Sequence, residues 1–375
     1  MKRRQGTPPE VRALIDAARR SQEGGSGARK HHLVPASYLR RWADPSGRIR
    51  QVMVNEATDH VTSAEKAARE TDYYRLEADE VDPDELPPLL METLLGYVES
   101  AAAPILDVLT SGTPNLAPDQ AAMLGWFIGL QMTRGHAYRR EAQALAHQTF
   151  VVQYAGATDR QLRRRIADNG QEPTDAAVAE ARDFLDRVAN GDIIIERHPA
   201  SVVGEAGLIA YDLGAYLFDR TWVVIETPPV MITTDEPVVR IPGPGQERAL
   251  RGGVGNAAVI MVPLSPRHAL AMFRPDIALA IGYQHFDTDQ LDYLETFELC
   301  TELKAHSERW CFEHPRQRVA ARLWVPPAPQ IEALERMGSL ETGDGTGELY
   351  RTSRSTRWGK YSSPPPWPVS RWWHE

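Results

Sequence analysis

Cysteine is scarce in this chain, with two residues in 375. That scarcity excludes a disulfide framework, and the absence of a CxxC pair excludes the usual zinc sites. Cys300 and Cys311 both fall in a predicted helix over residues 287–313, where eleven residues at a rise of ~1.5 Å would separate them by roughly 16 Å. A disulfide cannot span that distance, so we expect two buried free thiols in a cytoplasmic protein.

Long hydrophobic runs are also missing. The longest apolar stretch, around residues 121–130, is much shorter than the ~20 residues that a membrane-spanning helix needs. The basic start, Met1 to Arg4, leads into a polar, proline-bearing stretch instead of an apolar one, so we expect no signal peptide and no contact with a membrane.

The chain lacks a positive net charge. Its formal charge of −9 gives no overall attraction for nucleic acid or an anionic membrane. Residues 1–50 nevertheless hold twelve Lys and Arg against four Asp and Glu. A local basic face near the N-terminal region therefore leaves nucleic acid or a small anionic substrate open as a partner.

Familiar catalytic motifs are absent as well. The sequence contains no GxSxG, HExxH or phosphate-binding Walker loop. Residues 252–255 are glycine-rich, but no predicted helix follows them, which excludes the usual dinucleotide-binding context.

The composition that is present, 42% hydrophobic and 25% charged, is that of an ordinary globular protein. Hydrophobic periodicity predicts an α+β fold in which an α-rich helical body is joined by a C-terminal antiparallel sheet and an N-terminal histidine-bearing segment. We expect a helix and flexible link over 1–27, one α+β domain over 28–320, and a Pro/Gly/Trp-rich tail over 321–375. Within that domain we predict helices over 89–109, 118–154, 161–169, 174–190 and 200–218, a sheet over 220–275, and a last helix over 287–313.

The stretch from His31 to Trp42 is the densest in chemistry. Pro35 ends a strand and suits the first turn of a helix, which places His31 and His32 just before residues 36–42. Neutral imidazoles at such a position can act as metal ligands or as a general base. The alternative is that one ring lies in the core and the other in solvent.

Two further places carry polar groups in apolar surroundings. Asp235 lies where a predicted strand is stopped by Pro237; it can bind a metal ion or orient a histidine, or simply cap backbone amides. Gln131 and Arg134 lie on one side of a helix that is apolar nearly all round, so they need partners inside the protein. Arg134 can pair with a carboxylate such as Glu99 or hold an anionic ligand.

These observations predict one pocket that contains His31, His32, Gln131, Arg134 and Asp235. We expect His31, His32, Asp235 and Arg134 to act in catalysis. Substrate contacts are expected from Tyr38, Arg41, Gln131 and Thr234. A divalent Mn, Mg or Zn ion would be held by His32, Asp235 and Glu99.

Several motifs together resemble a bacterial family of proteins of unknown function, numbered 4238. Its opening His-His-x-x-Pro-x-x-Tyr-Leu motif is similar to residues 31–39, and its Gln-x-x-Arg helix to Gln131 and Arg134. Its Thr-Ser-Asp-Asn-Pro and Pro-Leu-Ser-Pro motifs resemble residues 233–237 and 263–266, with Glu236 in place of the asparagine. The asparagine expected near the last helix is not evident. The resemblance implies an architecture and no settled activity.

The leading functional hypothesis is a hydrolase, a metal-assisted phosphodiesterase or nuclease. The His-His-x-x-Pro start also resembles the opening of HNH nucleases, but Asn55 and His60 do not fit the spacing of the remaining positions. The alternative is a non-enzymatic binding or regulatory protein whose polar cluster is structural and whose Trp/Pro-rich tail contacts a partner.

Overall fold

The computed structural model describes residues 9–23, 30–56, 58–79, 82–83, 85–112, 114–154, 156–250, 252–328, 335–342, 345–351 and 356–373. Its contacts divide the chain into two compact units, which we describe separately. Unit 1 comprises residues 1–138, 199–328 and 356–375; unit 2 comprises residues 139–198 and 329–355.

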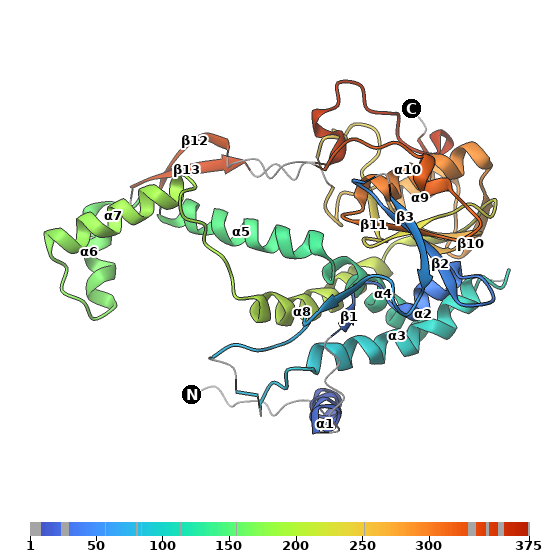
Figure 1. The fold of residues 1–375 in the computed structure, drawn as a ribbon. Coiled ribbons are helices and arrows are strands. Elements are labelled where there is room, and N and C mark those ends of the chain that lie inside the picture. Colours follow the sequence, from blue (N-terminus) through green and yellow to red (C-terminus); the bar gives the residue numbers. More distant parts are fainter. Residues whose placement is uncertain are drawn as a thin grey trace. The chain divides into compact units, whose positions relative to one another are not determined.

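Unit 1 combines helices with three sheets, which confirms the predicted α+β class (Figure 1). Its longer helices are α1 (Pro9–Glu23), α3 (Leu90–Leu109), α4 (Pro118–Thr133), α8 (Pro199–Phe218) and α10 (Tyr293–His306). Its shorter helices are α2 (Ala36–Leu39), η1 (Arg40–Trp42), α9 (Pro275–Ile281), α11 (Val319–Arg322), η2 (Arg357–Lys360) and η3 (Ser370–Trp372). None of the helices in the described residues is long and apolar enough to cross a membrane.

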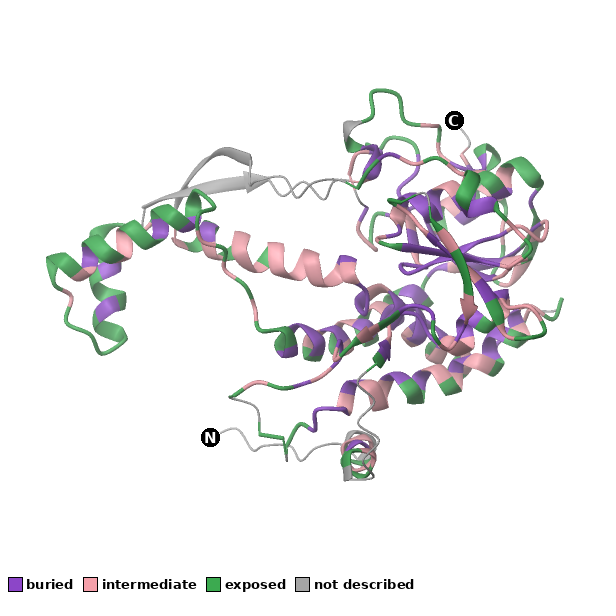
Figure 2. Cartoon of the chain, viewed as in Figure 1, coloured by how far each residue is buried: buried purple, intermediate pink, exposed green. Residues whose placement is uncertain are grey.

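A five-stranded sheet runs in the order β10-β5-β9-β8-β7. Its strands are β5 (Thr221–Glu226), β7 (Val239–Ile241), β8 (Val259–Ser265), β9 (His268–Phe273) and β10 (Asp287–Gln290). All neighbours are antiparallel except β10, which pairs parallel to β5. Its central strands are almost continuously apolar and buried, as Figure 2 shows.

A four-stranded sheet, in the order β3-β2-β11-β6, joins distant parts of the chain. The β2 (Arg48–Met53) and β3 (Asp59–Ser63) hairpin comes from the N-terminal region, whereas β6 (Thr233–Thr234) and β11 (Trp310–Glu313) come from the C-terminal half. A third, two-stranded sheet pairs β1 (Lys30–His32) with β4 (Arg69–Thr71).

Helices α4 and α8 of unit 1 pack closely because glycines of α4 lie against the backbone of α8. A Cβ atom on Gly129 would overlap the Ala210 carbonyl oxygen, and one on Gly125 would lie 2.8 Å from the Gly214 carbonyl oxygen. Gly125 and Gly129 thus permit close packing of the two helices.

Unit 2 has a small core of its own. Its helices are most of α5 (His136–Tyr154), then α6 (Asp159–Asp168) and α7 (Asp175–Ala189). The side chains of Leu162, Ile166, Val178 and Leu185 pack together. The strands β12 (Glu335–Thr342) and β13 (Gly345–Arg351) form an antiparallel pair.

Trp358 and Trp372 of the C-terminal tail are buried in unit 1. Trp372 is 1% exposed and meets Phe273 edge to face at 5.1 Å between ring centroids. Arg248 lies between the rings of Trp358 and Trp367, at 5.3 and 4.4 Å, and pairs with Glu302. In the alternative functional hypothesis the Trp/Pro-rich tail contacts a partner. In this structure Trp358, Trp367 and Trp372 make contacts within the chain itself.

Three predicted elements differ from the structure. The helix predicted over 287–313 is divided into β10, α10 and β11, because Asp292 and Glu295 form a capping box that begins α10 and Ser307 ends it. Cys311 therefore lies on β11, while Cys300 lies on α10; both are buried and free.

The helix predicted over 118–154 ends at Thr133 and restarts as α5 at His136. Between the two helices, Gly135 lies against Glu236 so closely that a Cβ atom would overlap its carboxylate, and Glu236 Oε1 accepts the Ala137 amide at 2.9 Å. The single sheet predicted over 220–275 is also wrong in one part, because β6, which lies in that range, pairs with β11 in the other sheet.

Candidate functional site

The histidine pair lies on β1, which runs antiparallel to β4 with His31 opposite Glu70. Pro35 is the N-cap of α2, which begins at Ala36 as the sequence predicts. Because side chains alternate along a strand, the two rings face different surroundings.

His31 is 1% exposed and stacks on Tyr74 with 5.6 Å between ring centroids. The Tyr74 amide donates to its Nδ1 at 2.8 Å. A backbone N–H can only donate, so Nδ1 carries no proton and the neutral ring holds its proton on Nε2. His31 is thereby fixed as a neutral donor and cannot serve as the base through Nδ1.

His32 is half-buried, and burial lowers its pKa below the ordinary value, as does the nearby charge of Arg69. Its Nε2 lies 3.0 Å from the Glu65 carbonyl oxygen and 3.0 Å from Arg69 Nε. One nitrogen cannot donate to the first and accept from the second at once, so the two contacts require different tautomers. In the tautomer that donates to Glu65, Nδ1 has its lone pair available.

Arg134, which is 3% exposed, connects α4 to the strand and to α3. Its guanidinium donates to the Tyr74 hydroxyl at 3.2 Å, to Glu99 at 2.6 Å and to the His32 carbonyl oxygen at 2.6 Å. Burial lowers its pKa, but the neighbouring Tyr74 and Glu99 raise it above the ordinary value. All three nitrogens thus bind protein partners, and the predicted pairing with Glu99 is confirmed.

Sequence reasoning missed Glu92. It lies on α3 seven residues before Glu99, two helical turns away and so on the same face, which is the signal that could have found it. The side chain is half-buried and has no hydrogen bond or ion pair to any residue that the structure describes. Burial raises the pKa of Glu92, while the positive charge of Arg134 lowers it. We call His31, His32, Glu92, Glu99 and Arg134 the histidine cluster.

Two arginines lie at the edge of this cluster. Arg69 is exposed, contacts His32, and pairs with no carboxylate in the described part of the chain. Arg309 is exposed too, but it pairs with Glu70, which also accepts His136 Nε2 at 2.8 Å. Of these two arginines, Arg69 is therefore the one whose guanidinium has N–H donors left to bind an anion.

Asp235 binds backbone. It is 3% exposed, and its two carboxylate oxygens accept the amides of Glu308, Arg309 and Trp310 at 3.0, 2.7 and 3.2 Å. Burial raises its pKa to about 7, although these amides lower it. These contacts are the ones expected if Asp235 caps backbone amides, which was the alternative to a metal-binding role. They connect the end of β6 to the start of β11.

The predicted substrate-contact residues of the first motif are bonded within the fold. The Tyr38 hydroxyl donates to the Pro263 carbonyl oxygen at 2.6 Å and lies 3.0 Å from Thr233 Oγ1. Arg41 Nε donates to the Leu264 carbonyl oxygen at 2.6 Å, and Thr234 Oγ1 accepts the Glu236 amide. Three motifs distant in sequence therefore meet here as a scaffold.

Gln131 is 2% exposed, and neither its Oε1 nor its Nε2 has a hydrogen-bond partner among the described residues. It precedes Arg134 by one helical turn, on the same side of α4. A buried amide of this kind needs a partner from outside the described residues, such as water or a ligand.

The predicted metal ligands do not come together. Within the described ranges, no three His, Cys, Asp or Glu side chains are placed to hold a metal ion. Glu99 is paired with Arg134, and both oxygens of Asp235 are occupied by backbone amides. The set of His32, Asp235 and Glu99 is thus not a ligand set, and we derive no step through a metal ion.

Comparison with protein families found a match that covers residues 30–316 and is described as a protein of unknown function, DUF4238. The chain belongs to this family. The DUF4238 match includes the histidine cluster, both larger sheets and α10. Comparisons of this DUF4238 protein with curated proteins and with solved structures found no match.

Proposed function

We propose that this protein is a hydrolase that cleaves a phosphodiester or a similar anionic substrate at the histidine cluster, by acid–base chemistry of its own side chains. The observation that carries the proposal is Glu92, a half-buried carboxyl that has no hydrogen bond or ion pair to any described residue and lies near His31, Glu99 and Arg134. A carboxyl with a raised pKa beside imidazoles is a typical acid of hydrolytic sites.

The proposed roles of His32 and His31 follow from their hydrogen bonds, and that of Glu92 from its burial. His32, with Nδ1 unprotonated, takes a proton from water as the water oxygen bonds to phosphorus. Glu92 gives its proton to the leaving oxygen as the phosphorus–oxygen bond breaks. The proton held by His32 then returns to Glu92 through solvent, so the cycle needs no further reactant. His31 stays neutral and holds β1 against Tyr74.

Arg69 is the proposed anion-binding group, because it is exposed and unpaired beside His32. A guanidinium suits a phosphate because it can donate two parallel hydrogen bonds. Arg134 takes a different role from the one that the sequence suggested. Its hydrogen bonds to Glu99 on α3 and to the His32 carbonyl oxygen on β1 hold these two elements of the cluster next to each other.

The test is hydrolysis of bis(p-nitrophenyl) phosphate and of labelled single-stranded DNA and RNA by the purified chain, with EDTA and with added Mn²⁺, Mg²⁺ or Zn²⁺. Glu92→Gln should lower kcat about 100-fold or more. Glu85→Gln, at an exposed glutamate just before α3, is the matched control and should retain full activity.

Two more variants separate the roles. His32→Ala should lose activity and regain part of it with added imidazole, which a purely structural histidine would not do. Arg69→Ala should raise KM about tenfold with a smaller change in kcat. No turnover of any of these substrates by the wild type, or full activity of Glu92→Gln, would contradict the proposal.

A further inference from the structure

Helix α8 has two apolar faces, and only one of them is covered in unit 1. The covered face packs on α4 through the backbone at Ala210 and Gly214. The other face carries Leu208, Tyr211 and Phe218, which are 74%, 63% and 43% exposed. A helix that is apolar all round is ordinarily buried on every side, so the exposed face of α8 is incomplete without a partner.

The exposed apolar residues of α8 follow the spacing of a helix–helix interface. They are separated in turn by three, four and three positions: Leu208, Tyr211, Ala215 and Phe218. This alternation is the 3.5-residue repeat by which one helix packs along another in a coiled coil. Gly204 continues the repeat at an exposed position, where a Cβ atom would meet nothing within 4 Å. These five residues, which we call the α8 stripe, offer about four turns of open helix surface.

One edge of the α8 stripe is acidic. Asp212 and Asp219 each follow a stripe residue by one position, where coiled coils carry their charged flanking residues. Both are exposed, and neither side chain has a hydrogen bond or ion pair to any residue that the structure describes. Gly207 and Gly214 form the other edge, against α3 and α4. Charge complementarity therefore favours a partner helix with Lys or Arg beside its apolar residues.

We infer that the α8 stripe binds an amphipathic helix of another protein, with apolar residues at a 3.5-residue repeat and basic residues beside them. Tyr211 is already held for this contact, since its ring meets Trp126 edge to face at 5.8 Å between centroids. The site shares no residue with the histidine cluster. A second copy of this chain fits less well, because two antiparallel α8 helices related by a two-fold axis would bring their acidic edges together.

Two labelled peptides of three heptads test the inference by fluorescence anisotropy with the full chain at about 0.15 M salt. Both carry leucine at the two apolar positions of each heptad, and they differ in having lysine or glutamate at the flanking positions. The lysine peptide should bind about tenfold or more tightly than the glutamate peptide. The double variant Asp212→Lys and Asp219→Lys should reverse this preference. Equal binding of the two peptides, or no binding of either at about 1 mM, would overturn the inference.

Apolar variants distinguish docking on the α8 stripe from general charge attraction. Leu208→Asp should weaken binding of the lysine peptide about tenfold or more, although it makes the chain more acidic. Leu279→Asp adds the same charge at a leucine of α9 that is 81% exposed, and it should not weaken binding. Equal effects of these two variants would place the peptide elsewhere.

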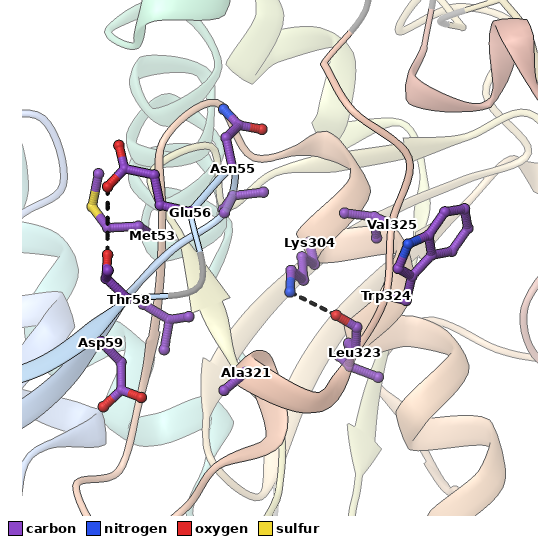
Figure 3. A pocket seen from close by; sticks show the side chains of 12 residues that line it. Met53, Asn55, Glu56, Thr58, Asp59, Lys304, Ala321, Leu323, Trp324 and Val325 are labelled. Carbon is purple, nitrogen blue, oxygen red and sulfur yellow. Dashed lines mark hydrogen bonds between the residues drawn. The ribbon is translucent and has the colours of Figure 1, made fainter.

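An aromatic pair provides a second comparison. Tyr211→Ala should weaken binding of the lysine peptide about tenfold. Trp324→Ala removes a ring of similar exposure, 60%, from the wall of the cavity beside Lys304 (Figure 3), and it should leave binding unchanged. Unchanged binding by Tyr211→Ala would contradict the assignment of the stripe.

Sedimentation velocity tests the second copy as the occupant. At about 0.1 mM the wild type and Leu208→Asp should sediment as the same species. A wild-type dimer that Leu208→Asp dissociates would overturn the inference, because the stripe would then be an interface between copies of this chain.

Discussion

At the residue scale, Arg134 holds the histidine cluster together, since it bonds Tyr74, Glu99 and the β1 backbone from a fully buried position. Arg134→Met should destabilise the fold by about 3–5 kcal/mol, because it leaves Glu99 and a strand carbonyl without their partner. Urea unfolding measures this loss. Glu99→Gln, which keeps a hydrogen-bond acceptor, should be milder; a loss below about 1 kcal/mol for Arg134→Met would contradict the structural role.

The pH dependence of the proposed hydrolysis should follow the titration of two side chains, Glu92 and His32. Burial raises the pKa of Glu92, so its protonated form persists above the ordinary range, and burial lowers the pKa of His32, so its neutral form persists below the ordinary range. The acid and the base therefore coexist best at mildly acidic pH, between roughly 4.5 and 6.5. A kcat/KM profile should be bell-shaped there, and Glu92→Gln should abolish its alkaline limb. A maximum above about pH 8 would contradict these roles.

Sequence reasoning reached part of the site. An arginine on an all-apolar helix must find an internal partner, and Glu99 was the right one. Asp235 shows the limit, because whether a carboxylate at a strand end binds metal or backbone depends on amides more than 70 positions later, at residues 308–310. Glu92 was missed because a glutamate in the first turn of a helix ordinarily needs no explanation beyond the helix dipole.

At the element scale, the contact between α4 and α8 depends on the missing side chain of Gly129. Gly129→Ala should destabilise the fold by more than about 3 kcal/mol, because the added methyl overlaps the Ala210 backbone and the two helices must separate. Gly96→Ala is the matched control: it is also inside a helix, α3, with nothing within 4 Å of the new Cβ atom.

Gly96→Ala should be neutral or stabilise the fold by about 0.4–1 kcal/mol. Thermal unfolding of both variants separates steric overlap from helix propensity, which improves in both. Equal Tm changes would mean that the α4–α8 contact is looser than the structure has it.

Elements with strong periodicity were predicted closely, such as α3 near 89–109 and α8 near 200–218. The wrong predictions concern the ends of elements and very short elements. The Asp292-x-x-Glu295 capping box was readable and would have begun α10 correctly. The two-residue strand β6 was not, because its sheet is decided by pairing with β11, which local sequence does not reveal.

At the scale of the whole molecule, unit 1 includes the C-terminal tail as part of its core. Trp372→Ala should destabilise the fold by about 3–5 kcal/mol, since a buried indole against Phe273 is removed. Trp324→Ala, at an indole that is 60% exposed, is the control and should change the free energy of unfolding by less than about 1 kcal/mol. Similar losses for both would mean that the tail does not stabilise the core.

The Tyr38 hydroxyl has one further consequence, which concerns how the chain reaches this structure. Its partners Thr233 and Pro263 lie 195 and 225 positions later in the sequence. Closing loops of that length is entropically expensive, and native pairings between such remote segments slow folding. Refolding from urea should therefore be slow and pass through a populated intermediate. In that intermediate the first 50 residues are not yet paired, because β2 can form its sheet with β11 only after the C-terminal half has reached it.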